Sequence, residues 1–258
     1  MRMFGAVESG DRHAHIVRLL QAAGRVEVGE LAARFDTSEV TVRRDLDELA
    51  NVGVLRRVRG GAVNLLMRGQ ELPFAIREME SAEAKTRIGA AVAGLLRDGE
   101  AVVLDTGTTT LAVARSLSGR RLTVMTLSLH AVGPLSTNSS ITLMVPGGAA
   151  RYGELSLNGP MTQADLAELR FDTAVLSCCG LSLSDGVTGH DLSDVAVKRA
   201  AIAASARTIL VADSAKFART ALAVICPTDR IDVLVTDSGA PEEDMVALRL
   251  AGVQVLCV

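Results

Sequence analysis

Aromatic side chains are nearly missing from this chain of 258 residues, which has no Trp, one Tyr and five Phe. Proteins that bind single-stranded nucleic acid stack the bases on aromatic side chains, so the composition excludes that class. The hydrophobic fraction of 48% still supplies a sizeable core, which must be built from Ala, Val, Leu and Ile. A chain that is disordered throughout is therefore excluded as well.

Long apolar runs are also missing. The longest, at residues 90–96 and 221–227, are much shorter than the roughly 20 residues that cross a bilayer. The N-terminal segment lacks the apolar core of a signal peptide. We therefore expect a cytoplasmic protein that does not enter the membrane.

Cysteine is scarce and shows no metal-binding pattern. The four cysteines, at positions 178, 179, 226 and 257, lack C-x-x-C spacing, and the adjacent pair lies in an apolar run. We expect all of them to be buried structural thiols. We expect no disulfide, no metal site and no cofactor.

Residues 10–66 have the pattern of a winged helix-turn-helix domain. Apolar spacing and turn residues predict three helices followed by a hairpin with Gly60 and Gly61 at its tip. The expected helices and strands lie at residues 12–23, 28–35, 39–50, 54–58 and 62–66. Two short helices joined by a tight turn are typical of domains that bind double-stranded DNA.

The third helix is expected to enter the major groove. Val42, Leu46 and Leu49 have the spacing of its inner face, and alternation along the wing sends Arg57 and Arg59 to one face and Arg56 to the other. The predicted DNA contacts are Ser38, Glu39, Thr41, Val42, Arg43, Arg44, Arg56, Arg57, Arg59 and Gly60. A solvated arginine-rich surface is the alternative, and the net charge of −3 does not decide between them.

Residues 67–84 are expected to be a linker, and residues 85–258 to form a second domain. Its strands are apolar without alternation and are separated by helices, which predicts a mostly parallel α/β sheet covered on both faces. The expected strands are 101–104, 122–126, 141–145, 171–178, 208–212, 231–236 and 253–258. The expected helices are 85–96, 111–117 and 194–206.

A threonine-rich loop, residues 105–110, joins a strand to a helix in this second domain. Gly107 lets backbone amides turn toward a ligand, and hydroxyl groups beside a helix N-terminus favour an anion such as phosphate. The loop matches neither the P-loop nor the G-x-G-x-x-G pattern. A threonine-rich helix cap is the alternative interpretation.

Lysine is rare, with three lysines against 24 arginines. Lys85, Lys198 and Lys216 all lie in the second domain, and a compact ammonium group suits a phosphate. Gly148 and Arg151 form another strand-end loop, which either presents the arginine to an anion or is an ordinary turn.

Residues 25–63, RVEVGELAARFDTSEVTVRRDLDELANVGVLRRVRGGAV, closely resemble the DNA-binding region of DeoR-type bacterial transcriptional regulators. TVRRDL and VLRRVRGGA are the most specific parts. The resemblance continues through nearly the whole chain, in Lys85-x-x-Ile-Gly, Asp105-x-Gly-Thr-Thr, Gly147-Gly148-x-x-Arg151, Gly159-Pro160, Phe171-Asp172, Val197-Lys198-Arg199 and Ala212-Asp213-x-x-Lys216-Phe217.

The resemblance implies a sensor domain that shares its fold with ribose-5-phosphate isomerase and glucosamine-6-phosphate deaminase. It also implies a sugar-phosphate effector that changes DNA affinity, usually by relieving repression. The implied effector site comprises Lys85, Asp105, Gly107, Thr108, Thr109, Gly148, Arg151, Asp194, Lys198 and Lys216. The chain departs from the family pattern at Leu127, where the family often has Asn, and at Asp36, where the turn usually has Gly.

We therefore predict a homo-oligomeric DNA-binding repressor of sugar-metabolism genes that is released from its operator by a phosphorylated sugar and is not an enzyme. One alternative is a sugar-phosphate isomerase or deaminase with an appended DNA-binding domain, in which Asp105, Asp194 and Asp213 are candidate bases. Another is a DNA-binding scaffold without an effector. The sequence alone leaves open which sugar phosphate binds, which operator and genes are controlled, whether the protein is a dimer or a tetramer, and whether it represses or activates.

Overall fold

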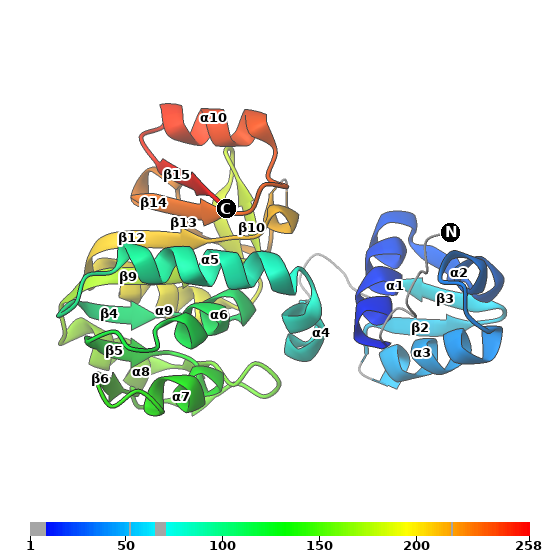
Figure 1. The fold of residues 1–258 in the computed structure, drawn as a ribbon, viewed down its shortest axis with the longest axis horizontal. Coiled ribbons are helices and arrows are strands. Elements are labelled where there is room, and N and C mark those ends of the chain that lie inside the picture. Colours follow the sequence, from blue (N-terminus) through cyan, green and yellow to red (C-terminus); the bar gives the residue numbers. More distant parts are fainter. Residues whose placement is uncertain (1–8, 52, 65–70, 218) are drawn as a thin grey trace. The chain divides into compact units, whose positions relative to one another are not determined.

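The computed structural model describes residues 9–51, 53–64, 71–217 and 219–258. The chain divides between Glu80 and Ser81 into two compact units (Figure 1). Both units contain helices and strands, but their sheets are of different kinds. The first has a small antiparallel sheet and the second a large parallel one.

The first unit combines four helices, among its described residues, with a three-stranded sheet of order β1-β3-β2. Its elements are α1 (Ser9–Ala23), β1 (Arg25–Glu27), α2 (Val28–Arg34), α3 (Glu39–Asn51), β2 (Leu55–Val58), β3 (Gly61–Asn64) and α4 (Phe74–Met79). The predicted hairpin is present as β2 and β3, and the last two residues of the expected strand 62–66 lie outside the described residues. β1 was not predicted, since a three-residue strand is too short to show alternation.

The core of the first unit joins the inner faces of its helices and strands. Its most buried members are each at most 2% exposed and come from positions with helical or strand spacing. They are Ile16, Val17, Leu20, Leu31, Val42, Leu46, Leu49, Val54 and Leu55. The predicted apolar face of the third helix is thereby confirmed.

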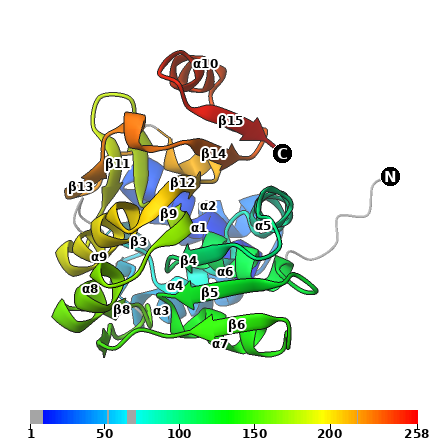
Figure 2. The same cartoon turned by 90° about the vertical axis from the view of Figure 1, so that its left-hand side faces the viewer.

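The second unit contains a seven-stranded parallel sheet of order β15-β14-β12-β9-β4-β5-β6. Its strands are β4 (Ala101–Leu104), β5 (Leu122–Thr126), β6 (Ile141–Met144), β9 (Phe171–Ser177), β12 (Ser205–Val211), β14 (Val233–Thr236) and β15 (Gln254–Cys257). Figure 2 shows these strands in order, with β6 at the bottom and β15 at the top. The predicted parallel α/β sheet is confirmed.

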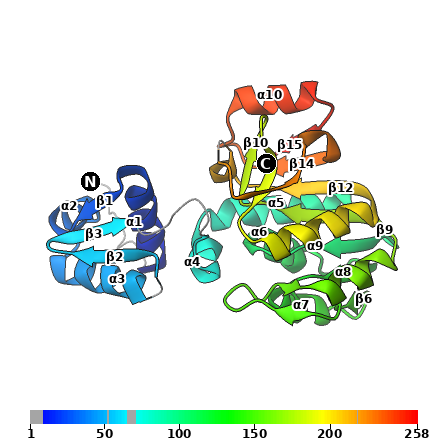
Figure 3. The ribbon, with the colours of Figure 1, turned by 180° about the vertical axis from the view of Figure 1, so that it is seen from behind.

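Helices cover both faces of this sheet. Figures 1 and 3 show α5 and α6 on one face and α8 and α9 on the other. The helices are α5 (Ala82–Leu95), α6 (Thr108–Ser116), α7 (Leu129–Ser136), α8 (Pro160–Ala167), α9 (Leu192–Ala203), α10 (Glu242–Leu250) and the 3₁₀ turns η1 (Ser214–Lys216) and η2 (Thr228–Arg230). Because both faces are covered, the strands are buried on both sides, which explains their unbroken apolar sequences.

Two small antiparallel sheets complete the second unit. β7 (Ala149–Ala150) and β8 (Leu157–Asn158) form a hairpin, while β10 (Gly180–Ser182), β11 (Gly186–Gly189) and β13 (Ala223–Cys226) form a three-stranded sheet. Tyr152, the single tyrosine of the sequence, lies between β7 and β8 and is 99% exposed.

Some expected boundaries are wrong. The helix expected at 194–206 begins at Leu192 and ends at Ala203, because Ser205 already pairs with Phe171 as the first residue of β12. In the part of the chain that the structure describes, no helix is long and apolar enough to cross a bilayer.

The cysteines are free, but they do not share one environment. Cys178 and Cys226 are buried, and burial raises the pKa of their thiols to about 12 and about 11. Cys179 is half-buried, and Cys257 is exposed on β15. The expectation of four buried thiols is therefore wrong for Cys257, which lies on a strand at the edge of the sheet.

Candidate functional site

The turn between α2 and α3 has the geometry that the sequence predicts. Asp36 adopts a left-handed conformation with φ of 47°, which Asp tolerates better than most residues. Ser38 then caps α3, since its hydroxyl accepts a hydrogen bond of 3.1 Å from the backbone N–H of Thr41. A helix-turn-helix therefore forms even though Asp replaces the usual glycine.

The two faces of α3 differ in exposure. Glu39, Arg43 and Arg44 are exposed, as a helix that enters the major groove requires. Val42 is 0% exposed and packs in the core, so its inclusion among the predicted DNA contacts is wrong. Its side chain belongs to the hydrophobic core of the first unit and helps to hold α3 in place.

Both exposed arginines of α3 are paired along the helix. Arg43 donates to Glu39 at 2.5 Å, and Arg44 donates to Glu48 at 3.2 Å. Exposed pairs of this kind contribute about 0–1 kcal/mol. A DNA phosphate or guanine can replace these carboxylates at little cost.

The wing, which is the hairpin of β2 and β3, contacts α3 through one of its arginines. Arg57 donates to Asp47 of α3 at 2.8 Å and to the carbonyl of Gly61 at 2.9 Å. Arg56 and Arg59 are exposed, whereas Arg57 is half-buried. Arg57 therefore folds back onto α3, and its predicted contact with DNA stays a prediction.

A buried carboxylate fixes α3 against α1. Asp45, 3% exposed, accepts hydrogen bonds from Arg12 at 2.5 and 2.9 Å and lies 3.1 Å from His13. The hydrogen bond to Asp45 raises the pKa of Arg12. In the sequence, Asp45 stands directly before the apolar Leu46 on the inner face of α3. The sequence analysis did not assign a role to Asp45.

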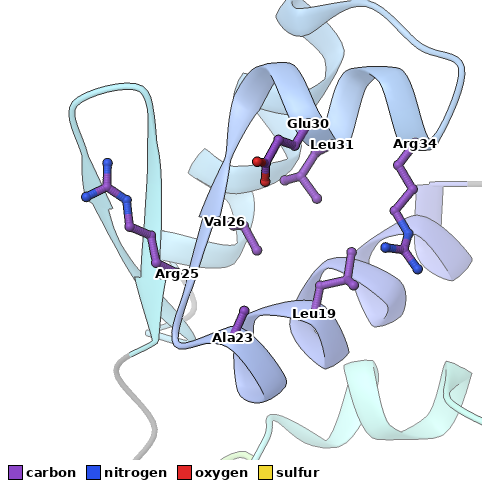
Figure 4. Close-up of a pocket in the computed structure, with 7 residues that line it drawn as sticks. All are labelled: Leu19, Ala23, Arg25, Val26, Glu30, Leu31 and Arg34. Carbon is purple, nitrogen blue, oxygen red and sulfur yellow. The ribbon is translucent and has the colours of Figure 1, made fainter.

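A hollow of about 410 Å³ opens beside α1 and α2 of this unit. Figure 4 shows an apolar floor with charged side chains at its rim. It is lined by Leu19, Ala23, Arg25, Val26, Glu30, Leu31 and Arg34. Its lining includes none of the residues predicted to contact DNA or effector.

In the second unit, the strand order reverses between β4 and β9. From β4 the chain continues to β5 and β6 on one side, and from β9 to β12, β14 and β15 on the other. Parallel α/β sheets bind ligands at such a reversal, outside the carboxyl ends of the strands. Residues that follow β4 and β9 are therefore the candidates for a ligand site.

Asp105 and Lys198 form a buried ion pair at this reversal, and their exposed fractions are 1% and 4%. The Asp105 carboxylate also accepts hydrogen bonds from the Ser177 backbone N–H at 2.8 Å and hydroxyl at 3.2 Å. Burial lowers the pKa of Lys198, but the Asp105 carboxylate outweighs that effect, so the pKa lies above its ordinary value. Two residues of the predicted effector site are thus brought together, with Ser177 beside them.

The first turn of α6 begins beside this ion pair. Gly107, the residue before α6, has φ of 121°, and a Cβ there would lie 2.8 Å from the Ser177 hydroxyl oxygen. Thr108 and Thr109 follow and are buried at 6% and 5% exposure. A helix N-terminus and a buried lysine thus meet in one place, an arrangement that suits an anion.

A second cluster lies one turn earlier on α9. Asp194 binds Arg151 at 2.7 Å and accepts a hydrogen bond of 2.9 Å from Ser156, which in turn accepts one of 3.2 Å from Asn158. Asp194 also raises the pKa of Lys198, so the two clusters are electrostatically linked. The structure thus brings Arg151 and Asp194 together, as predicted.

Gly148 holds the hairpin loop of this cluster against α8. Its φ is 137°, and a Cβ there would lie 2.2 Å from the Thr162 hydroxyl oxygen and 2.7 Å from the Asn158 carbonyl oxygen. Thr162 also donates to the Gly147 carbonyl at 2.7 Å. A glycine is therefore required for the loop to approach so closely.

The two remaining lysines differ in position. Lys216 lies in η1, and both it and Lys198 act to lower the pKa of the Cys178 thiol, although burial raises it more strongly. Lys85 is buried on α5 at 4% exposure. Its role as an effector ligand stays a prediction.

Two buried hydroxyl groups near the carboxyl edge are absent from the predicted effector site, although Thr106 lies in the threonine-rich loop that the sequence analysis singled out. Thr106 Oγ1 and Ser128 Oγ have no hydrogen-bond partner within the described residues. Leu127, which stands where the related pattern often has Asn, is 1% exposed and lies in the main hydrophobic core. The signal was the position of Thr106 and Ser128 directly beyond two neighbouring strands.

Two family profiles match the chain. The DeoR-like helix-turn-helix domain matches residues 12–65, and the DeoR C terminal sensor domain matches residues 80–238. The transcriptional repressor AccR of Agrobacterium fabrum is 35% identical over 89% of this chain and 90% of its own. The glycerol-3-phosphate regulon repressor of Escherichia coli is 31% identical over 95% of this chain and 98% of its own.

Among solved structures, ribose 5-phosphate isomerase A of Methanocaldococcus jannaschii is similar at a TM-score of 0.41 and 14% identity, covering 54% of this chain and 56% of that one. A likeness of this size carries no argument about the site. The two profiles and the relatives, in contrast, cover almost the whole sequence. The chain belongs to the DeoR family of transcriptional regulators.

Proposed function

We propose that this protein is a repressor that holds an operator through α3 and the wing and releases it when a phosphorylated sugar binds the second unit. The observation that carries the effector half is the buried Asp105–Lys198 pair beside the first turn of α6, at the reversal of the strand order. The relatives named above are repressors, and one controls a glycerol-3-phosphate regulon.

In this proposal the phosphate lies at the N-terminus of α6. Thr108 and Thr109 supply hydroxyl and backbone N–H groups there, and Lys198 and Lys216 supply positive charge. The incoming dianion competes with the Asp105 carboxylate for Lys198. Effector binding therefore rearranges an existing ion pair, and it changes DNA affinity only insofar as the two arrangements bind DNA differently.

On the DNA side, the exposed Arg43 and Arg44 contact the groove while Arg56 and Arg59 contact phosphates. Operators of helix-turn-helix proteins are read in half-sites, so we propose a homo-oligomer with two-fold symmetry.

We propose that the second unit senses its ligand without converting it. An isomerase needs a carboxylate that is free to take a proton from the substrate. Asp105 is engaged by Lys198 and Ser177, Asp194 by Arg151 and Ser156, and Asp213 caps η1. Turnover of ribose 5-phosphate or glucosamine 6-phosphate that is lost in Asp105→Asn would contradict this.

The test is fluorescence anisotropy of the full chain on DNA flanking its own gene, with and without a panel of sugar phosphates. We expect tight binding that one sugar phosphate releases. Lys216→Ala should bind the DNA like the wild type but resist release, because a charge facing the phosphate is lost.

Arg121→Ala is the control for that variant, since Arg121 is an exposed cation of the same unit, 76% exposed. It should respond to the sugar phosphate like the wild type. Release of the Lys216→Ala protein at wild-type concentrations would contradict the proposed site.

A further inference from the structure

Two hydroxyl groups at the carboxyl edge of the sheet are buried without a hydrogen-bond partner. Thr106 is 8% exposed and Ser128 is 1% exposed, and neither Oγ1 of the first nor Oγ of the second has a partner in the part of the chain that the structure describes. An unpaired buried hydroxyl destabilises a folded protein, because no hydrogen bond offsets the loss of its contact with water. Such groups call for a specific explanation, and an absent ligand is one.

The register of the sheet places these two residues side by side. β4 and β5 are adjacent parallel strands, with Leu104 opposite Thr126. The ladder continues for one more step, since the Leu127 N–H donates to the Leu104 carbonyl at 2.9 Å. Counting on in this register, Thr106 stands opposite Ser128, two residues beyond the end of each strand.

Their neighbours are the two clusters of the candidate effector site. Thr106 directly follows Asp105, and its carbonyl accepts a hydrogen bond of 2.7 Å from Ser177. Ser128 forms an antiparallel bridge with Ser156, whose hydroxyl donates to Asp194. Thr106 is thus the chain neighbour of Asp105, and Ser128 pairs with the residue whose hydroxyl donates to Asp194.

This environment selects one part of a sugar phosphate. Carboxylates repel a phosphate group but accept hydrogen bonds from alcohols, and a neutral hydroxyl can both donate to and accept from an alcohol. The positive charge and the helix N-terminus that suit the phosphate belong to Lys198, Lys216 and α6. The uncharged pair thus suits the hydroxyl-bearing carbons of the ligand.

We infer that Thr106 and Ser128 are specificity-determining contacts that bind the sugar hydroxyls of the effector. The inference rests on the proposed function. It divides the proposed effector site into an end that binds the phosphate and an end that binds the sugar hydroxyls. Ser128 then supplies a polar contact beyond β5, where the neighbouring Leu127 belongs to the core.

The variants Thr106→Val and Ser128→Ala test this in the full chain. Each removes one hydroxyl and little else, so the ligand-free protein should melt at the same or a higher temperature, because an unsatisfied polar atom is lost. Ligand binding is measured by calorimetry with ribose 5-phosphate, glucosamine 6-phosphate, glycerol 3-phosphate and inorganic phosphate. The sugar phosphate that binds the wild type should bind each variant about fivefold more weakly, while inorganic phosphate binds within about twofold of the wild type.

Thr236→Val is the matched control. Thr236 Oγ1 is also buried and unpaired within the described residues, at the end of β14, which is separated from β4 by β12 and β9. This variant should likewise keep or gain thermal stability, and it should bind every ligand like the wild type.

The outcomes separate the inference from the proposed function. Wild-type affinity in both variants overturns the inference alone, and so does an equal loss of sugar phosphate and inorganic phosphate, which would place the hydroxyls at the phosphate. A marked fall in the melting temperature of the ligand-free variants overturns it as well, because the hydroxyls would then be engaged within the protein. A wild type that binds none of the four ligands contradicts the proposed function, and the inference falls with it.

Discussion

Arg43 and Arg44 each lie beside a carboxylate of their own helix, so their charges become available to DNA when weak surface pairs open. We expect Arg43→Ala and Arg44→Ala to weaken operator binding by about 1–3 kcal/mol, as the loss of a groove contact does. Anisotropy titrations at two salt concentrations measure this. A variant that loses a phosphate contact should also show a shallower salt dependence.

Arg121→Ala, which removes an exposed arginine of the other unit, is the control and should bind the operator normally. Unchanged DNA affinity in both α3 variants, with the fold intact, would exclude α3 as the groove-binding helix.

Two buried groups make the stability of the second unit sensitive to alkali. Burial raises the pKa of the Cys178 thiol from its ordinary value of 9.0 to about 12. Burial lowers the pKa of Lys198, but Asp105 raises it above its ordinary value of 10.5. Both groups hold their protons more tightly when folded, so their contributions are complete below the unfolded pKa values and are lost as the pH rises. Urea denaturation should show the unfolding free energy falling above about pH 9; a flat profile up to pH 11 would contradict this.

At the scale of single elements, the position of α3 depends on its contact with α1. We expect Asp45→Ala to lower the opening free energy of α1 and α3 by about 3 kcal/mol, since the Arg12 guanidinium, whose side chain is 12% exposed, loses its carboxylate. Amide hydrogen exchange of the full chain measures this locally, and the second unit should keep its protection. Asp47→Ala removes a 61% exposed acid from the same helix and should cost less than about 1 kcal/mol. An equal loss of opening free energy in the two variants would show that Asp45 does not stabilise the contact between α3 and α1.

The elements that could be predicted are those with a strong repeat or a capping residue. α3 shows this best, because Ser38 fixes its start and Val42, Leu46 and Leu49 mark its inner face. α7 contains Gly133 and Pro134, which disfavour a helix by local preference, and it forms because the chain must cross from β5 to β6. The two-residue strands of the β7–β8 hairpin are too short to show a pattern.

The residues of the candidate effector site could largely be predicted from the sequence, but the contacts between them could not. Strand ends and rare lysines pointed to Asp105 and Lys198, whereas Ser177 became visible only when β9 was found beside β4. Sheet order is a long-range property, and one sequence does not state which strands are neighbours. Thr106 and Ser128 were missed for the same reason.

At the scale of the whole molecule, the proposed DNA-binding and effector sites belong to different compact units, each with its own core. If a sugar phosphate lowers operator affinity by some factor, thermodynamic linkage requires the operator to lower the affinity for that sugar phosphate by the same factor. Calorimetric titration of the sugar phosphate with and without saturating operator checks this. A sugar-phosphate affinity that saturating operator leaves unchanged would show that this ligand does not control operator binding.

The hairpin that carries Arg151 also gives the molecule an optical property. The chain has no tryptophan, and Tyr152, its single tyrosine, stands fully in solvent directly after the arginine that binds Asp194. Near-ultraviolet emission of the unlabelled protein therefore comes chiefly from a single fluorophore beside a residue of the proposed effector site. A quencher in solution will sense that one position, and events at the hairpin can be followed without attaching a dye.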